Sequence, residues 1–127
     1  MNAVNKEEPF GIYARLRSLR CAFKGVELLL RTQHNAWIHA VATGAVVFLG
    51  FFFRVTRDEW IALTLAATLV WFAEALNTAL EFLADALHAA HHPGIGKAKD
   101  IAAGAVLLAA LGATITGLIV FVPYLTH

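Results

Sequence analysis

Cysteine and charged residues are scarce in this sequence of 127 residues, and each scarcity excludes a class of protein. Cys21 is the single cysteine, so no disulfide can form within the chain. Charged residues make up 15% of the chain and leave a net charge of +1, too small to indicate nucleic-acid binding. Hydrophobic residues make up 59%, and the mean hydropathy is +0.65. We therefore expect one membrane domain over residues 1–127 rather than a soluble globular protein.

Three segments are long and apolar enough to cross a membrane, at about residues 36–53, 60–80 and 101–125. Six basic residues precede the first segment and two lie between the second and third, against Arg54 and Arg57 between the first and second. Because basic loops stay in the cytoplasm, we expect a multi-pass protein with its N-terminus in the cytoplasm and its C-terminus outside. The eight cytoplasmic basic residues are Lys6, Arg15, Arg17, Arg20, Lys24, Arg31, Lys97 and Lys99.

The second segment is predicted to continue as a helix well beyond the membrane. Its pattern runs from Trp60 through His92, and Pro93-Gly94-Ile95-Gly96 is expected to end it. Such a helix is about 50 Å long, against about 30 Å of hydrocarbon. Its last turns should therefore project toward the cytoplasm.

An amphipathic helix is predicted ahead of the first span, at about residues 10–32. Its apolar residues recur every three or four positions, one flank is basic, and a third face carries small side chains. Such a helix is typical of the lipid interface, and small faces allow close helix packing. The third span has the same small-residue spacing, which predicts a packing seam. The seam residues are Ala105, Ala109, Ala113 and Gly117.

Glu74, Asn77, Glu81 and Asp85 form one polar stripe, because they fall within about 80° around a helix. Only fourteen uncharged residues, 60–73, precede Glu74 in the second span, so its carboxylate should lie inside the hydrocarbon or at its edge. A carboxylate there costs at least a few kcal/mol unless something compensates, which marks a candidate functional site. The alternative is a neutral structural carboxyl that is hydrogen-bonded to a neighbouring helix.

A second polar cluster, Lys97-Ala98-Lys99-Asp100, precedes the third span at the same cytoplasmic interface. Acidic metal ligands and a phosphate-pairing lysine can meet there, as Mg²⁺ and a nucleotide require. The nearby Gly94-Ile95-Gly96-Lys97 is not a Walker A motif, because His91 and Ala98 replace the glycine and the Ser or Thr that it needs. Two simpler alternatives remain open: Asp100 as an N-cap of the third span, and the lysines as topology signals.

Two stretches together resemble the signature of a known family. They are Phe72-Ala73-Glu74-Ala75-Leu76-Asn77-Thr78-Ala79-Leu80-Glu81 and Lys97-Ala98-Lys99-Asp100-Ile101-Ala102-Ala103-Gly104-Ala105-Val106-Leu107. The chain is similar in this respect to the small bacterial membrane lipid kinases, the prokaryotic diacylglycerol kinase and undecaprenol kinase family. The resemblance extends over nearly the whole chain. It implies a homotrimer in the bacterial inner membrane, composite active sites between protomers, ATP as the phosphate donor and Mg²⁺.

The resemblance also implies roles for individual residues. Glu74 matches the proposed general base and Asn77 a polar residue beside it, while Glu81 matches a metal ligand. The positions that the resemblance places in contact with the nucleotide are Lys99, Asp100, Arg17 and Lys24.

One position departs from the family pattern. Many members have a glutamate as a second metal ligand ahead of the first span, and this chain has Gln33. An amide offers an oxygen but no charge, so metal affinity is expected to be weaker, or Glu27 substitutes from a neighbouring turn.

The sequence thus predicts an ATP-dependent kinase acting on a membrane lipid hydroxyl, with diacylglycerol or undecaprenol as the acceptor. The stretch Asn35–His39 looks more like the undecaprenol kinase branch. A channel or proton-relay subunit is the alternative from another functional class. It accounts for Glu74 but leaves Glu81 and Lys99 unexplained.

Overall fold

The computed structural model describes residues 11–87 and 92–127, and all of its regular structure is helical. The helices are α1 (Ile12–Thr32), α2 (His34–Phe53), α3 (Arg57–Ala86) and α4 (Pro93–Thr126). The chain forms two compact units, residues 1–32 and 33–127. The helix predicted ahead of the first span is present as α1, although residue 10, its expected first residue, lies outside the described part. The prediction of an all-helical chain is confirmed.

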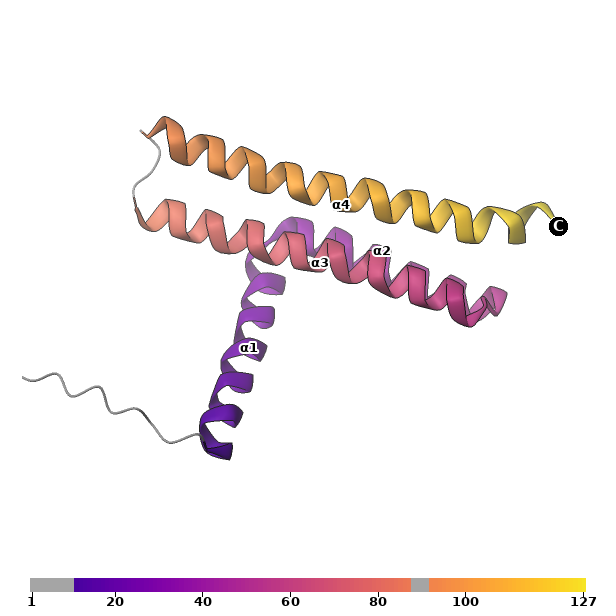
Figure 1. Ribbon diagram of the computed structural model, residues 1–127, viewed down its shortest axis with the longest axis horizontal. Helices are drawn as coiled ribbons and strands as arrows, with labels where there is room; N and C mark the ends of the chain where they lie inside the picture. Colours follow the sequence, from indigo (N-terminus) through magenta and orange to yellow (C-terminus); the bar gives the residue numbers. More distant parts are fainter. Residues whose placement is uncertain (1–10, 88–91) are drawn as a thin grey trace, which may run out of the picture. The chain divides into compact units, whose positions relative to one another are not determined.

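Helices α2, α3 and α4 lie side by side in the second unit, with α3 in contact with both neighbours (Figure 1). They contain 20, 30 and 34 residues, and all three are long and apolar enough to cross a membrane, as predicted. At 1.5 Å per residue they are about 30, 45 and 51 Å long. Helix α2 therefore matches the hydrocarbon thickness, while α3 and α4 exceed it.

A short turn joins α2 to α3 and is stabilised at both helix ends. Arg54 adopts the left-handed conformation (φ 53°), and its N–H bonds to carbonyls of the last α2 turn. Thr56 and Glu59 then form a reciprocal capping box at the start of α3. Tyr124 near the end of α4 donates a hydrogen bond to Glu59 Oε2 at 2.8 Å. The Thr56 backbone N–H and the Tyr124 hydroxyl lower the pKa of the Glu59 carboxyl.

One antiparallel register holds α3 against α4 along most of their length. Tyr124 contacts Glu59 at one end, and Lys99 contacts Asp85 at the other. The two pairs are 26 residues apart on α3 and 25 apart on α4, so both fit the same antiparallel register.

Two apolar clusters fill the space between these paired ends. Val55, Leu63, Val120 and Phe121 form one near the α2–α3 turn, and Val70, Ala73 and Ala109 form the other in the middle of the α3–α4 contact. Ala113 packs against the second cluster. The predicted small-residue seam therefore contacts α3 at Ala109 and Ala113, whereas Ala105 lines a groove beside it.

Helix boundaries between the second and third spans differ from the prediction. Helix α3 does not continue through His92; it ends at Ala86, with Leu87 as its C-cap. Pro93-Gly94-Ile95-Gly96 does not stop a helix but begins α4, because proline is well suited to the first helical turn. The N-cap is His92, whose Nδ1 accepts from the Gly94 N–H at 3.1 Å. The alternative interpretation of Asp100 as an N-cap is thus wrong.

Gly50 is required where the end of α2 meets the beginning of α3. A Cβ at this position would lie 2.5 Å from the indole of Trp60, well inside van der Waals contact. The indole also packs against the cluster that contains Val55 and Leu63, and it contacts the ring of Phe51, with ring centroids 5.0 Å apart. At Gly44, on the same helix, a Cβ would meet no atom of a neighbouring described segment within 4 Å.

We predict that Gly50→Ala destabilises the protein by about 1–3 kcal/mol through overpacking. Gly44→Ala is the matched control and should be neutral or stabilising by up to about 1 kcal/mol, because alanine restricts the unfolded backbone more than glycine does. Thermal unfolding of both variants in the same detergent measures the difference. Equal midpoints for the two variants would contradict the close approach at Gly50.

Candidate functional site

Glu74 is the most deeply buried charged residue described, with 1% of its surface exposed. It lies on α3, and the nearest group of opposite potential charge is His39 on α2. His39 Nε2 is 3.4 Å from Glu74 Oε2, close enough for an ion pair but without hydrogen-bond geometry. The carboxyl therefore faces an adjacent helix at a depth where water has little access.

His39 is fixed by contacts on its own helix and on α3. Thr43 Oγ1 donates to the His39 backbone carbonyl at 2.7 Å and accepts from Trp71 Nε1 at 3.0 Å. The His39 and Trp71 rings meet edge to face, with centroids 6.2 Å apart. These contacts join α2 and α3 one turn away from Glu74.

The other residues of the polar stripe, Asn77, Glu81 and Asp85, also lie on α3, where their helical spacing places them along one face. Asn77 is 6% exposed, and its Nδ2 donates to Glu81 Oε1 at 3.2 Å. Further along, Lys99 of α4 contacts Asp85 at 3.3 Å. Asp85 is exposed and Lys99 half-buried, and exposed ion pairs contribute only about 0.2–1 kcal/mol, so an incoming phosphate can displace this contact.

Several buried polar atoms have no hydrogen-bond partner among the described residues. They are both carboxyl oxygens of Glu74, Asn77 Oδ1, Thr78 Oγ1 and His39 Nε2. Buried polar atoms are nearly always hydrogen-bonded in folded proteins, so a cluster of unsatisfied ones marks a place where a polar ligand group fits. A hydroxyl can donate to Glu74 and accept from a neighbour at the same time.

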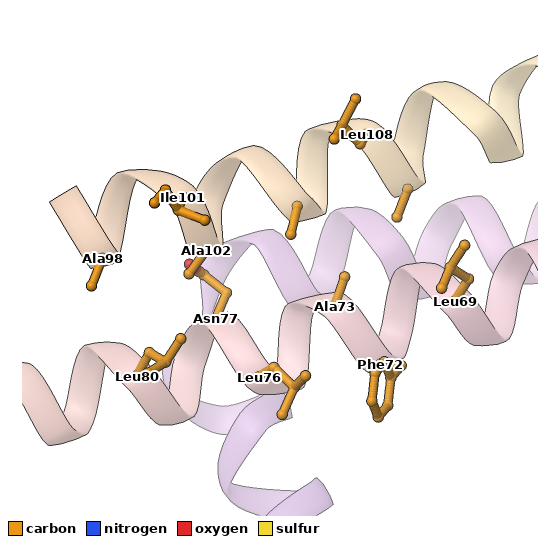
Figure 2. A pocket seen from close by; sticks show the side chains of 12 residues that line it. Leu69, Phe72, Ala73, Leu76, Asn77, Leu80, Ala98, Ile101, Ala102 and Leu108 are labelled. Atoms are coloured by element: carbon orange, nitrogen blue, oxygen red, sulfur yellow. The ribbon is translucent and has the colours of Figure 1, made fainter.

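A groove of about 670 Å³ lies beside this cluster, between α3 and α4. Figure 2 shows Asn77 extending from α3 toward α4 near Ala102, with apolar side chains along the rest of the groove. Asn77 is the polar residue of the lining; the others are Leu69, Phe72, Ala73, Leu76, Leu80, Ala98, Ile101, Ala102, Ala105, Leu108 and Ala109. Apolar walls with one polar group suit a hydrocarbon chain that carries a polar end.

The second unit also contains the other candidate residues predicted there. Lys99 and Asp100 lie on the second turn of α4, with Lys99 half-buried and Asp100 exposed. Gln33 is half-buried and is the N-cap of α2, but its side chain makes no capping bond. Its amide therefore remains available to another ligand.

The first unit contains Arg17, Lys24 and Glu27, all exposed on α1. Glu27 forms an ion pair with Arg31 one turn later, at 2.7 Å. This pair uses Oε1 of Glu27, and Oε2 remains as an oxygen that could bind a metal.

Within residues 11–87 and 92–127, no three His, Cys, Asp or Glu side chains are grouped to hold a metal ion. Glu81 still offers hard carboxylate oxygens, and Mg²⁺ often binds through one or two carboxylates together with substrate phosphates. The residues present thus fit a Mg²⁺ that arrives with a nucleotide better than a separate protein cage.

Sequence reasoning did not identify His39, Thr43 or Trp71 as parts of the site. The signal was present, because His39 and Thr43 are four residues apart in an otherwise apolar span and so share one face. That these residues lie near Glu74 could not be predicted, because it depends on how α2 is aligned with α3, and residue spacing within one helix does not give this alignment.

Known proteins are similar to this chain over most of its length. A sequence model described as prokaryotic diacylglycerol kinase matches residues 20–121. An undecaprenol kinase of Bacillus subtilis is 38% identical over 104 residues, which is 82% of this chain and 85% of the relative. A diacylglycerol kinase of Synechocystis is 40% identical over 103 residues, 80% of this chain and 59% of that longer protein. The chain therefore belongs to the prokaryotic diacylglycerol kinase family and is a lipid kinase.

Proposed function

We propose that this protein transfers the γ-phosphoryl group of ATP to the hydroxyl of a membrane lipid. The observation that carries the proposal is the buried Glu74 carboxyl, 1% exposed, on the same helix as Asn77 in the apolar groove. A lipid can place its chain along the apolar walls and its hydroxyl near the unsatisfied Oδ1 of Asn77, three residues along α3 from Glu74. The alternative of a channel or proton-relay subunit does not account for the kinase family to which the chain belongs.

Glu74 acts as the general base in the proposed reaction. It takes the proton of the lipid hydroxyl as the lipid oxygen forms its bond to the γ-phosphorus, and the bond from that phosphorus to the β-phosphate oxygen breaks to release ADP. Asn77 Oδ1 helps to orient the hydroxyl. A water-excluding site favours this transfer over hydrolysis of ATP.

Glu81, with Gln33 and Glu27 as further candidates, would hold Mg²⁺ together with the nucleotide phosphates. Bound there, Mg²⁺ neutralises phosphate charge. Asn77 already donates to Glu81 and so orients its carboxylate. Lys99 stabilises charge on the phosphates after it leaves Asp85, and Asp100 contacts the nucleotide.

Membrane placement follows from the basic residues and from α1. We infer that residues 1–127 form one domain of the bacterial inner membrane, with the N-terminus in the cytoplasm and the C-terminus outside. Helix α1 is the amphipathic surface helix, and its Arg17 and Lys24 approach nucleotide phosphates.

We further propose a homotrimer with active sites shared between protomers. Large apolar side chains remain exposed on α2, α3 and α4, and the small residues of α4 allow close helix contacts. Family membership supports this assembly, which would bring α1 of one protomer near the stripe of another.

We predict that ATP consumption by the purified protein requires a hydroxylated lipid, and that undecaprenol is a better acceptor than diacylglycerol. Undecaprenol is favoured because of the Asn35–His39 stretch and because the chain covers 85% of the undecaprenol kinase relative, against 59% of the diacylglycerol kinase relative. Side-by-side phosphorylation in mixed micelles measures the ratio of kcat/KM. ATP turnover without any acceptor, or no product with either lipid, would contradict the proposed function.

We predict that Glu74→Gln folds and inserts normally but loses about 10²- to 10⁴-fold in kcat. The amide keeps the size of the side chain and removes the proton acceptor. The measurement is turnover at saturating lipid and ATP, with thermal unfolding as the check on folding. Near-normal turnover would exclude Glu74 as the base.

We predict that Gln33→Glu lowers the Mg²⁺ concentration needed for half-maximal rate, because a second carboxylate adds charge to the metal site. Glu81→Ala should abolish metal-dependent activity. Titration of activity with Mg²⁺ at constant ATP tests both variants. If Gln33→Glu leaves the requirement unchanged, the second ligand lies elsewhere, and Glu27→Ala becomes the informative variant.

A further inference from the structure

His39 and Glu74 form a buried pair whose role is not covered by the family signature. The carboxyl of Glu74 has lost its hydration, and an ionised carboxylate in such a place needs a donor or a positive charge. His39 Nε2, 3.4 Å from Glu74 Oε2, is the partner that the structure provides. Its side chain is only 15% exposed, so the pair is shielded from solvent.

His39 also has contacts other than Glu74 in the α2–α3 interface. The His39 backbone carbonyl accepts from Thr43 Oγ1, which in turn accepts from Trp71 Nε1, and the imidazole and indole rings pack edge to face. The imidazole is therefore held in the α2–α3 interface before any substrate arrives.

Among the described residues that line the cavity next to His39, no other side chain is titratable. His39 lines a cavity of about 360 Å³ between α2, α3 and α4. The α4 residues of that cavity are all uncharged and untitratable: Ala110, Ala113, Thr114 and Gly117. From α3, Glu74 is the group that faces the imidazole.

We propose that His39 is a positioning residue for Glu74: its Nε2–H donates to Oε2 of the carboxylate and leaves Oε1 for the lipid hydroxyl. This inference rests on the proposed function, because it assigns a role within the same reaction. The distance of 3.4 Å is long for a hydrogen bond, and such catalytic contacts commonly tighten when the substrate is bound.

A kinetic comparison of two substitutions tests the proposal. His39→Leu fills a similar volume without a donor, and it should lower kcat about 10- to 100-fold while KM for ATP is unchanged. His39→Gln keeps an N–H donor at a comparable reach and should restore most of the lost kcat. If His39→Leu retains the wild-type kcat, or if both variants lose activity equally, the positioning role is wrong.

A double-mutant cycle on stability tests the contact without requiring activity. His39→Leu should lower the thermal unfolding midpoint in the wild-type chain, because it leaves a buried carboxylate without its partner. In a Glu74→Gln chain the same substitution should lower the midpoint much less. Equal shifts in the two backgrounds would show that the side chains do not interact, and would overturn the inference.

Failure of the inference is distinguishable from failure of the proposed function. If the wild-type protein phosphorylates lipid and Glu74→Gln does not, while His39→Leu is fully active, only the role of His39 is lost. If the wild-type protein phosphorylates no lipid alcohol, the proposed reaction is wrong, and the role of His39 in that reaction is wrong with it, even where the cycle shows coupling.

Discussion

A carboxylate can be buried among apolar helices only if neighbouring groups replace part of the hydration that it loses. Glu74 imposes this requirement on the second unit of the chain, because it is 1% exposed. The imidazole of His39 comes from α2 and reaches the carboxyl, while Asn77 lies one turn further along the same helix. The position of α2 against α3 thus matters for the chemistry as well as for packing.

The position of α2 against α3 is determined by contacts that lie far from the Glu74 carboxyl. Gly50 lets the Trp60 indole approach the α2 backbone, and the capping box fixes where α3 begins. Because helices are stiff, a turn defined at one end determines which side chains meet many residues away. His39 and Glu74 meet in this way, and Lys99 reaches Asp85 through the corresponding register of α3 and α4.

Hydropathy and spacing predicted the three spans and the polar stripe, because these features depend on residues within one helix. The boundaries after Ala86 were wrong because Pro93 and Gly94 were interpreted as helix breakers, whereas proline in a first turn and a histidine N-cap begin α4. The capping box at Thr56 and Glu59 follows the sequence pattern of a Thr with a Glu three residues later, and so depends on residues close together in the chain. The contact between His39 and Glu74 could not be predicted from the sequence, because contacts between helices depend on how the helices are aligned with each other, and a single sequence does not give that alignment.

The difference in length between α2 and α3 determines how deep each polar residue of α3 lies in the membrane. Helix α2 ends and α3 begins at the turn of residues 54–56, and α3 is ten residues longer, so its last ten residues lie beyond the level of the first residue of α2. Glu74 falls just before that level, and Glu81 and Asp85 fall after it. Under the proposed function, the general base Glu74 lies at the edge of the hydrocarbon, and Glu81 and Asp85 lie in the aqueous phase where the nucleotide phosphates bind. A small soluble alcohol has no hydrocarbon chain that would hold its hydroxyl at this boundary. The lengths of the two helices therefore favour an amphiphilic alcohol as the substrate, independently of any recognition of its headgroup.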